Sequence, residues 1–153
     1  MSFDEYLIGA IVALPFEILG HWGWDEFVHK RRTRALKKKY GFLARQYRNL
    51  HDFKPTGGRI DLSQQHDGSF SITAYNVDRS IEWTGSLSMS TTEEDVGAAT
   101  YQYVSGINHG TQRVVYVRDR DVLHVVGTNQ STLAHAEFIH VWEPFVRRDK
   151  TLI

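Results

Sequence analysis

The sequence predicts a mainly β protein: an eight-stranded antiparallel up-and-down barrel preceded by an N-terminal helix. Three observations support this prediction. Beyond about residue 40, apolar residues alternate with polar ones in short runs, which is the period of a half-buried strand. The connections between these runs are too short for a crossover helix, so neighbouring strands should pair antiparallel. A long apolar stretch followed by a basic run precedes the strands.

Length and composition limit the class of protein. The chain has 153 residues and no Cys, with 41% apolar and 12% aromatic residues. One domain is usual for about 100–200 residues. The absence of Cys excludes a disulfide scaffold, a Cys-based zinc site and a thiol nucleophile. The apolar content excludes a disordered chain.

Residues 1–25 are predicted to be a membrane segment. From Tyr6 to Trp24 the only charge is Glu17, and such a helix would be about 28 Å long, close to the ~30 Å core of a bilayer. Its uninterrupted apolar core is shorter, however, and Pro15 would kink it. An interfacial helix and a buried helix therefore stay open as alternatives. The predicted anchor residues are Leu7, Ile8, Ile11, Trp22 and Trp24.

Residues 26–40 are predicted to form a basic juxtamembrane helix. The whole chain balances 18 Lys and Arg against 18 Asp and Glu, but seven cations fall between Lys30 and Lys39. Cations beside a membrane span stay on the cytoplasmic side. We therefore expect membrane lipid as a partner and the barrel on the cytoplasmic side of the cell inner membrane. The reverse order, cations before the apolar run, is typical of a signal peptide.

Residues 41–150 are predicted to form the β-barrel domain. The clearest strand places Ile81, Trp83, Leu87 and Met89 on one face. An up-and-down barrel leaves no free edge, and a two-sheet sandwich is the alternative. The predicted strands are Phe42–Asn49, Arg59–Gln64, Ser69–Asn76, Ile81–Ser90, Ala98–Val104, Thr111–Asp119, Val122–Gly127 and Glu137–Glu143.

An eight-stranded barrel has an interior that side chains can fill or that can hold one small ligand. The sequence does not decide between a packed core and a ligand cavity. If there is a cavity, aromatic, histidine and methionine side chains of the inward faces would line it. These predicted ligand-binding residues are Tyr47, Phe70, Trp83, Met89, Tyr101, His124, His140 and Trp142.

No pattern in the sequence predicts catalytic residues, a metal site or a cofactor. His124 and His140 fall on predicted strands and His135 in the loop between them, without a metal-ligand spacing. The acidic run Glu93–Asp95 is typical of a solvated loop. Four arginines of the barrel are candidate phosphate clamps: Arg45, Arg48, Arg59 and Arg113. Residues 55–153 are net negative, so polymeric nucleic acid is not expected as a partner.

This layout of apolar segment, basic junction and small barrel resembles the membrane-anchored β-barrel effectors of bacterial cyclic-oligonucleotide antiphage systems. The resemblance implies a barrel that binds a cyclic nucleotide and a membrane segment that self-associates as a homo-oligomer. That family carries two membrane helices, whereas this chain offers one. The strand pattern is also lipocalin-like, although Tyr40-Gly41-Phe42 stands where a lipocalin has a glycine–tryptophan signature.

Three functional hypotheses follow. The first is a membrane-anchored cytosolic barrel that senses a ligand or acts as an effector, nucleotide-responsive in antiphage defence if the resemblance holds. The second is a soluble lipocalin-like carrier of a small apolar ligand. The third is an enzyme built on the barrel, for which the sequence offers no convergent acid–base set.

Overall fold

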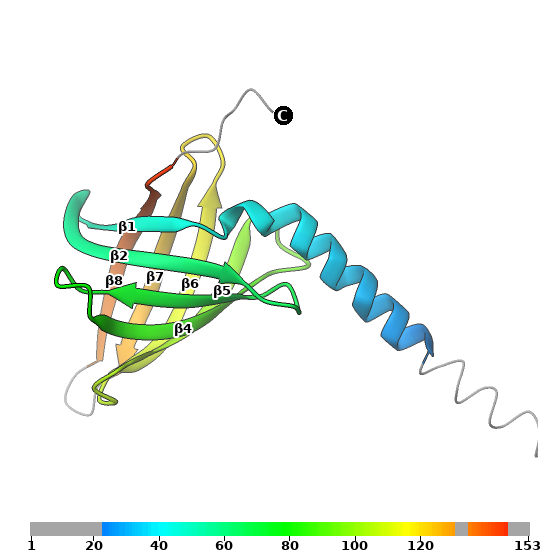
Figure 1. The fold of residues 1–153 in the computed structure, drawn as a ribbon, viewed down its shortest axis with the longest axis horizontal. Helices are drawn as coiled ribbons and strands as arrows, with labels where there is room; N and C mark the ends of the chain where they lie inside the picture. Colours follow the sequence, from blue (N-terminus) through cyan, green and yellow to red (C-terminus); the bar gives the residue numbers. More distant parts are fainter. Residues whose placement is uncertain (1–22, 131–134, 147–153) are drawn as a thin grey trace, which may run out of the picture. The chain divides into compact units, whose positions relative to one another are not determined.

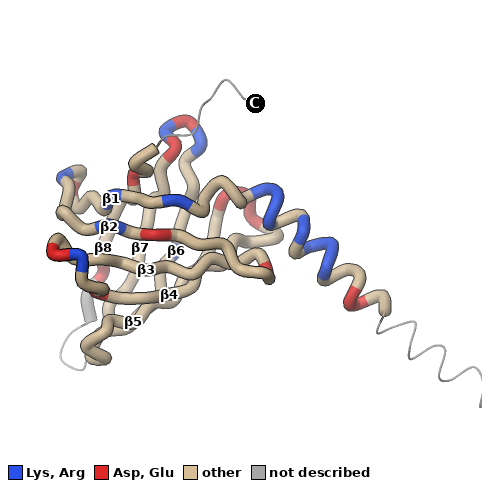
Figure 2. Tube along the Cα trace, viewed as in Figure 1, with Lys and Arg blue, Asp and Glu red and all other residues tan. Residues whose placement is uncertain are grey.

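The computed structural model describes residues 23–130 and 135–146. The chain divides into two compact units, residues 1–35 and residues 36–153. A helix covers residues 23–40, and along it Figure 2 shows Lys and Arg following one another closely. Lys30 and Glu26 form an ion pair of 2.6 Å one turn apart.

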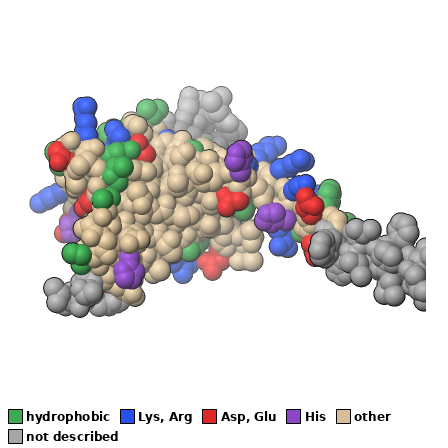
Figure 3. Space-filling model, turned by 60° about the horizontal axis from the view of Figure 1, so that its bottom comes forward, with side chains coloured by type: hydrophobic (Ala, Val, Ile, Leu, Met, Phe, Trp, Pro, Cys, Tyr) green, Lys and Arg blue, Asp and Glu red, His purple; other side chains and the backbone are tan. Residues whose placement is uncertain are grey.

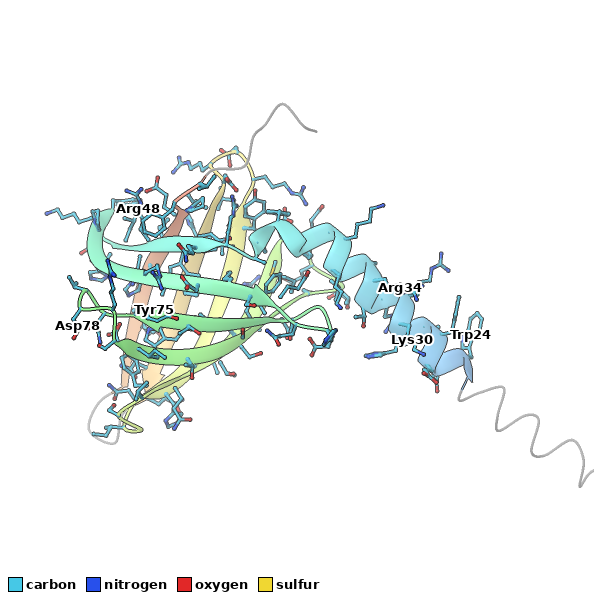
Figure 4. The ribbon with its side chains drawn as sticks, viewed as in Figure 1. Trp24, Lys30, Arg34, Arg48, Tyr75 and Asp78 are labelled. Carbon is cyan, nitrogen blue, oxygen red and sulfur yellow. The ribbon has the colours of Figure 1, made fainter. Side chains whose placement is uncertain are left out.

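The predicted membrane segment lies mostly outside the described residues. Of its anchor residues only Trp24 is described, and its ring lies exposed on the helix, 6.0 Å from that of Phe27. Figure 4 shows Trp24 together with Lys30 and Arg34 on this helix. Within the described ranges, no helix has both the length and the apolar composition needed to cross a membrane.

The second unit is a closed barrel in which every strand pairs antiparallel with its neighbours in the sequence (Figure 1). Strands β1 and β8 close it, with Tyr47 opposite Pro144 and His51 opposite His140. The predicted up-and-down barrel is confirmed, and the sandwich alternative is wrong. The strands are β1 (Gln46–His51), β2 (Lys54–Gln64), β3 (Phe70–Tyr75), β4 (Ile81–Met89), β5 (Val96–Tyr103), β6 (His109–Val117), β7 (Val122–Gln130) and β8 (His135–Pro144).

The bounds of every strand differ from the prediction by one or more residues, and two of these differences change the place of a named residue. Phe42 does not begin the first strand, because Gly41–Leu43 form a short 3-10 helix, η1, whose Leu43 is fully buried. His135 belongs to β8 rather than to a loop, since it pairs with Gln130 at the end of β7. Both differences arise because backbone pairing, not the pattern of side chains, sets where a strand starts.

The inward faces form one core, as the alternation predicted. Its members include Ile60, Leu62, Phe70, Ile72 and Leu87.

Ile81, which the alternation predicted to face inward, lies outside this core. Tyr75 pairs with Ile81 while the preceding Ala74 pairs with Trp83, so Glu82 is the extra residue of a β-bulge. Because of the bulge, the side chain of Ile81 at the start of β4 points to the outer face of the barrel. Ile81 is consequently 46% exposed, which corrects its assignment to the face of Trp83.

One end of the barrel is closed by η1 and by the residues around it. Tyr40 is buried there and its hydroxyl accepts a hydrogen bond from the backbone N–H of Asp95, at 3.0 Å. The Tyr47 hydroxyl donates to the carbonyl of Leu43 at 3.0 Å, and burial raises the pKa of Tyr47 to about 12. The Arg45 side chain spans the same end and is paired with Asp121.

Deleting residues 1–35 is expected to leave a folded barrel, because Leu36 packs against the core and Tyr40 is part of it. Far-UV circular dichroism should retain the β spectrum with a cooperative thermal transition. A deletion that also removes Tyr40 is the matched comparison, and it should melt at a lower temperature. An unfolded 36–153 chain would contradict the prediction.

Candidate functional site

The barrel contains a cavity of about 400 Å³ at the end remote from η1. The strand ends that border it are those of the β1–β2, β3–β4 and β5–β6 turns, at which Thr56, Asn76 and Tyr103 line it. Because η1 and the Arg45–Asp121 pair close the opposite end, this end is the entrance. A concave site of this size, with aromatic walls and a few polar groups, is typical of small-molecule binding.

Aromatic side chains form one wall of the cavity. The ring of Trp83 lies 5.5 Å from that of Tyr101 and 6.2 Å from that of Trp142, and the ring of Tyr101 lies 6.0 Å from that of Phe138. The Tyr101 hydroxyl donates a hydrogen bond to the carbonyl of Thr128 at 2.9 Å. Burial raises the pKa of Tyr101 to about 12, so the phenol stays neutral at physiological pH. The ring of Tyr101 is therefore held by a hydrogen bond from an uncharged hydroxyl.

Glycines make room for these rings. A Cβ at Gly127 would lie 2.6 Å from the Cζ atom of Phe138, and one at Gly110 would lie 1.9 Å from the carbonyl oxygen of Thr128. Gly110 also lies beside the Tyr101 hydroxyl. Any side chain at these two positions would displace the aromatic wall. The shape of the cavity therefore depends on glycine at both positions.

Two amide side chains of the cavity have oxygens that lack hydrogen-bond partners. Gln112 on β6 is only 5% exposed, and both its Oε1 and the Oδ1 of Asn129 on β7 are buried without a donor among the described residues. Most buried polar atoms in proteins have a partner, and leaving one unpaired costs about 1–3 kcal/mol. Both residues line the cavity, and a small rotation of either side chain would offer its unpaired acceptor to a molecule there.

The bulge of β4 brings a carboxyl group to the cavity. Glu82 lines it beside Trp83, and burial raises the pKa of Glu82 above its ordinary value. His140 lines the opposite wall, where burial first and then the neighbouring His51 lower its pKa. The neutral ring of His140 donates from Nδ1 to the Oδ1 of Asn49 at 2.9 Å. Glu82 is accordingly the charged group of the cavity wall.

Glu82→Gln is expected to stabilise the protein at neutral pH by no more than about 1 kcal/mol, since the group is partly screened by solvent. Its carboxyl has a higher pKa in the folded than in the unfolded state, so ionisation favours unfolding. The difference between variant and wild type should disappear as the pH falls below about 4. Thermal melts across pH measure this, with the exposed Glu137→Gln as control. A gain that persists at low pH would contradict the explanation.

The structure brings half of the predicted ligand-binding residues to this cavity: Trp83, Tyr101, His140 and Trp142. Tyr47, Phe70 and Met89 are buried in the core but do not line it.

His124 lies on the outer face of β7, since its neighbours Leu123 and Val125 are fully buried. This corrects its placement in the interior. Glu82, Gln112 and Asn129 line the cavity but were not among the predicted binding residues. Alternation along β6 and β7 puts both amides inward with Val114 and Val125, which is the signal that could have found them.

The four candidate phosphate clamps do not come together. Each pairs with a carboxylate instead, and none lines the cavity. The arginine of β1 lies on its outer side, as Figure 4 shows for Arg48. None of the four arginines therefore forms a phosphate clamp at this cavity. The pairs are Arg45–Asp121, Arg48–Glu143, Arg59–Asp61 and Arg113–Glu93.

A second hollow of about 560 Å³ lies on the outer face of β4, β5 and β6. It is lined by exposed polar side chains such as Thr84, Ser86, Thr100 and Gln102. Figure 3 shows that most of the barrel surface in view carries neither Lys nor Arg side chains. None of the buried unpartnered atoms of the described residues belongs to this hollow, so the interior cavity is the better candidate.

Comparisons of the chain with models of protein families, with curated proteins and with solved structures each return no match. Function is therefore inferred from the geometry of the cavity.

Proposed function

We propose that the barrel is a binding module for one small molecule, which enters at the open end. The observation that carries this proposal is the pair of buried, unpartnered amide oxygens of Gln112 and Asn129 in a cavity with aromatic walls. Leaving such an acceptor unpaired costs about 1–3 kcal/mol, and a hydrogen bond from a bound molecule would remove that cost. An anionic ligand such as a cyclic nucleotide is disfavoured, because the lining residues include Glu82 and neither Lys nor Arg.

The fluorescent probe N-phenyl-1-naphthylamine tests this proposal. We expect saturable one-to-one binding with increased emission, because the uncharged probe is small and aromatic. Asn129→Phe would fill the cavity and should abolish binding in a protein that still melts cooperatively. Thr128→Phe, the same change on the outer face of β7, should leave binding intact. Equal probe binding by wild type and Asn129→Phe would overturn the proposal.

We further propose that the N-terminal region holds the barrel at the cytoplasmic face of a membrane. The supporting observation is the exposed aromatic pair Trp24 and Phe27, about one turn from exposed cations such as Lys30 and Arg31. Each cation near an anionic leaflet contributes about 1 kcal/mol of attraction. Aromatic rings of this kind favour the headgroup region.

Co-sedimentation of the full chain with lipid vesicles tests this attachment. Binding to phosphatidylglycerol vesicles should exceed binding to phosphatidylcholine vesicles and should weaken as salt rises. Replacing the seven Lys and Arg of residues 30–39 by Gln should remove the preference for anionic lipid. A preference that survives this replacement would contradict the proposed role of the basic run.

A further inference from the structure

The charge of the cavity limits what can occupy it. Glu82 lies in the cavity wall, and burial raises the pKa of its carboxyl group. A cation close to this carboxyl group favours its ionised form. Lys54 and Arg79, which lie at the bordering turns, are exposed and do not line the cavity. His140 has a lowered pKa and contributes no positive charge at neutral pH. The wall therefore attracts cations and repels anions.

The aromatic wall favours the same sign of charge. Trp83, Tyr101, Phe138 and Trp142 form one wall of the cavity, with ring centroids 5.5–6.2 Å apart along their contacts. The faces of such rings carry a negative quadrupole and attract organic cations, an effect that grows when the cation is desolvated. Aromatic rings next to a carboxylate are a suitable environment for an ammonium or amidinium group.

The unpartnered oxygens add a requirement for donors. The Oε1 of Gln112 and the Oδ1 of Asn129 can only accept hydrogen bonds. A quaternary ammonium has no N–H group and cannot donate a hydrogen bond. On the basis of the proposed binding function, we propose that the occupant is an organic cation with N–H donors: a protonated amine or amidine on an aromatic or apolar body. A cavity of about 400 Å³ limits that body to a small molecule.

Three probes of matched size and different charge test the inference: phenethylamine, 2-phenylethanol and phenylacetate. Each is titrated near neutral pH against the complex with N-phenyl-1-naphthylamine, whose loss of emission reports displacement. Phenethylamine should displace the dye at a concentration about tenfold lower than phenylacetate, with 2-phenylethanol between them. Tetramethylammonium, which has no N–H donor, should displace it more weakly than phenethylamine.

Two variants test whether the carboxyl group of Glu82 causes the preference for the amine. Glu82→Gln should bring phenethylamine and 2-phenylethanol to similar displacing concentrations, once each is corrected for the affinity of this variant for the dye. Glu137→Gln, the same change at an exposed position of β8, should keep the preference of the wild type.

The outcomes separate the two proposals. Dye binding with no preference for the amine, or a preference that persists in Glu82→Gln, would overturn the inference and leave the binding module standing. Absence of dye binding in the wild type would overturn the binding module and the inference with it.

Discussion

Trp83→Ala is expected to lower the free energy of unfolding by about 3–5 kcal/mol. Trp83 is only 7% exposed, and its indole contacts the rings of Tyr101 and Trp142. Truncation removes a large apolar surface and leaves a space that the neighbouring rings cannot close. Equilibrium unfolding in urea measures the loss as a lower midpoint.

Trp24→Ala is the matched control for this prediction. It deletes the same side chain from a position that is 63% exposed, so stability should change by less than about 0.5 kcal/mol. Equal midpoints for Trp83→Ala and the wild type would show that the indole of Trp83 does not contribute to the core. The same variant should also weaken binding of the naphthylamine dye, because the wall of the cavity loses a ring.

The barrel could be predicted because each strand has a residue pattern that is visible within its own short segment. Alternation at period two places Phe70 and Ile72 on one face whatever lies opposite them, and short turns leave only antiparallel pairing with the next strand. The prediction failed where a strand is apolar on both faces. Val122, Leu123, Val125 and Val126 give β7 no clear alternation, and His124 was therefore placed on the wrong side.

The candidate site was harder to predict because it depends on contacts between distant residues. The bulge that turns Glu82 toward the cavity comes from the pairing of β3 with β4. The sequence of β4 alone does not indicate this shift in pairing. The arginines show the same limit: Arg45 pairs with Asp121, 76 residues further along the chain. A lone Arg on a strand predicts a cation, but only the fold determines whether a carboxylate already neutralises it.

The pair between Arg45 and Asp121 is expected to be one of the most sensitive points of the barrel. Asp121 is 3% exposed and accepts hydrogen bonds from the Arg45 guanidinium at 3.0 Å and from the Tyr116 hydroxyl at 2.9 Å. Asp121→Asn removes the charge while keeping the size of the side chain and its tolerance of the positive φ of 55° at this turn. The loss should be about 3–5 kcal/mol, since the arginine is left without its counter-charge in a largely buried place.

Two comparisons show whether burial is the cause. Glu93→Gln breaks the ion pair with Arg113, in which both side chains are exposed, and should cost less than about 1 kcal/mol. The double variant Arg45→Met/Asp121→Asn removes the unpaired cation as well, so it should be more stable than Asp121→Asn alone, with a coupling of about 0.5–3 kcal/mol. Urea unfolding of the wild type, Arg45→Met, Asp121→Asn, Glu93→Gln and the double variant measures both. If Asp121→Asn and Glu93→Gln lowered the midpoint equally, closure of this end of the barrel would depend on η1 and Tyr40 rather than on the ion pair.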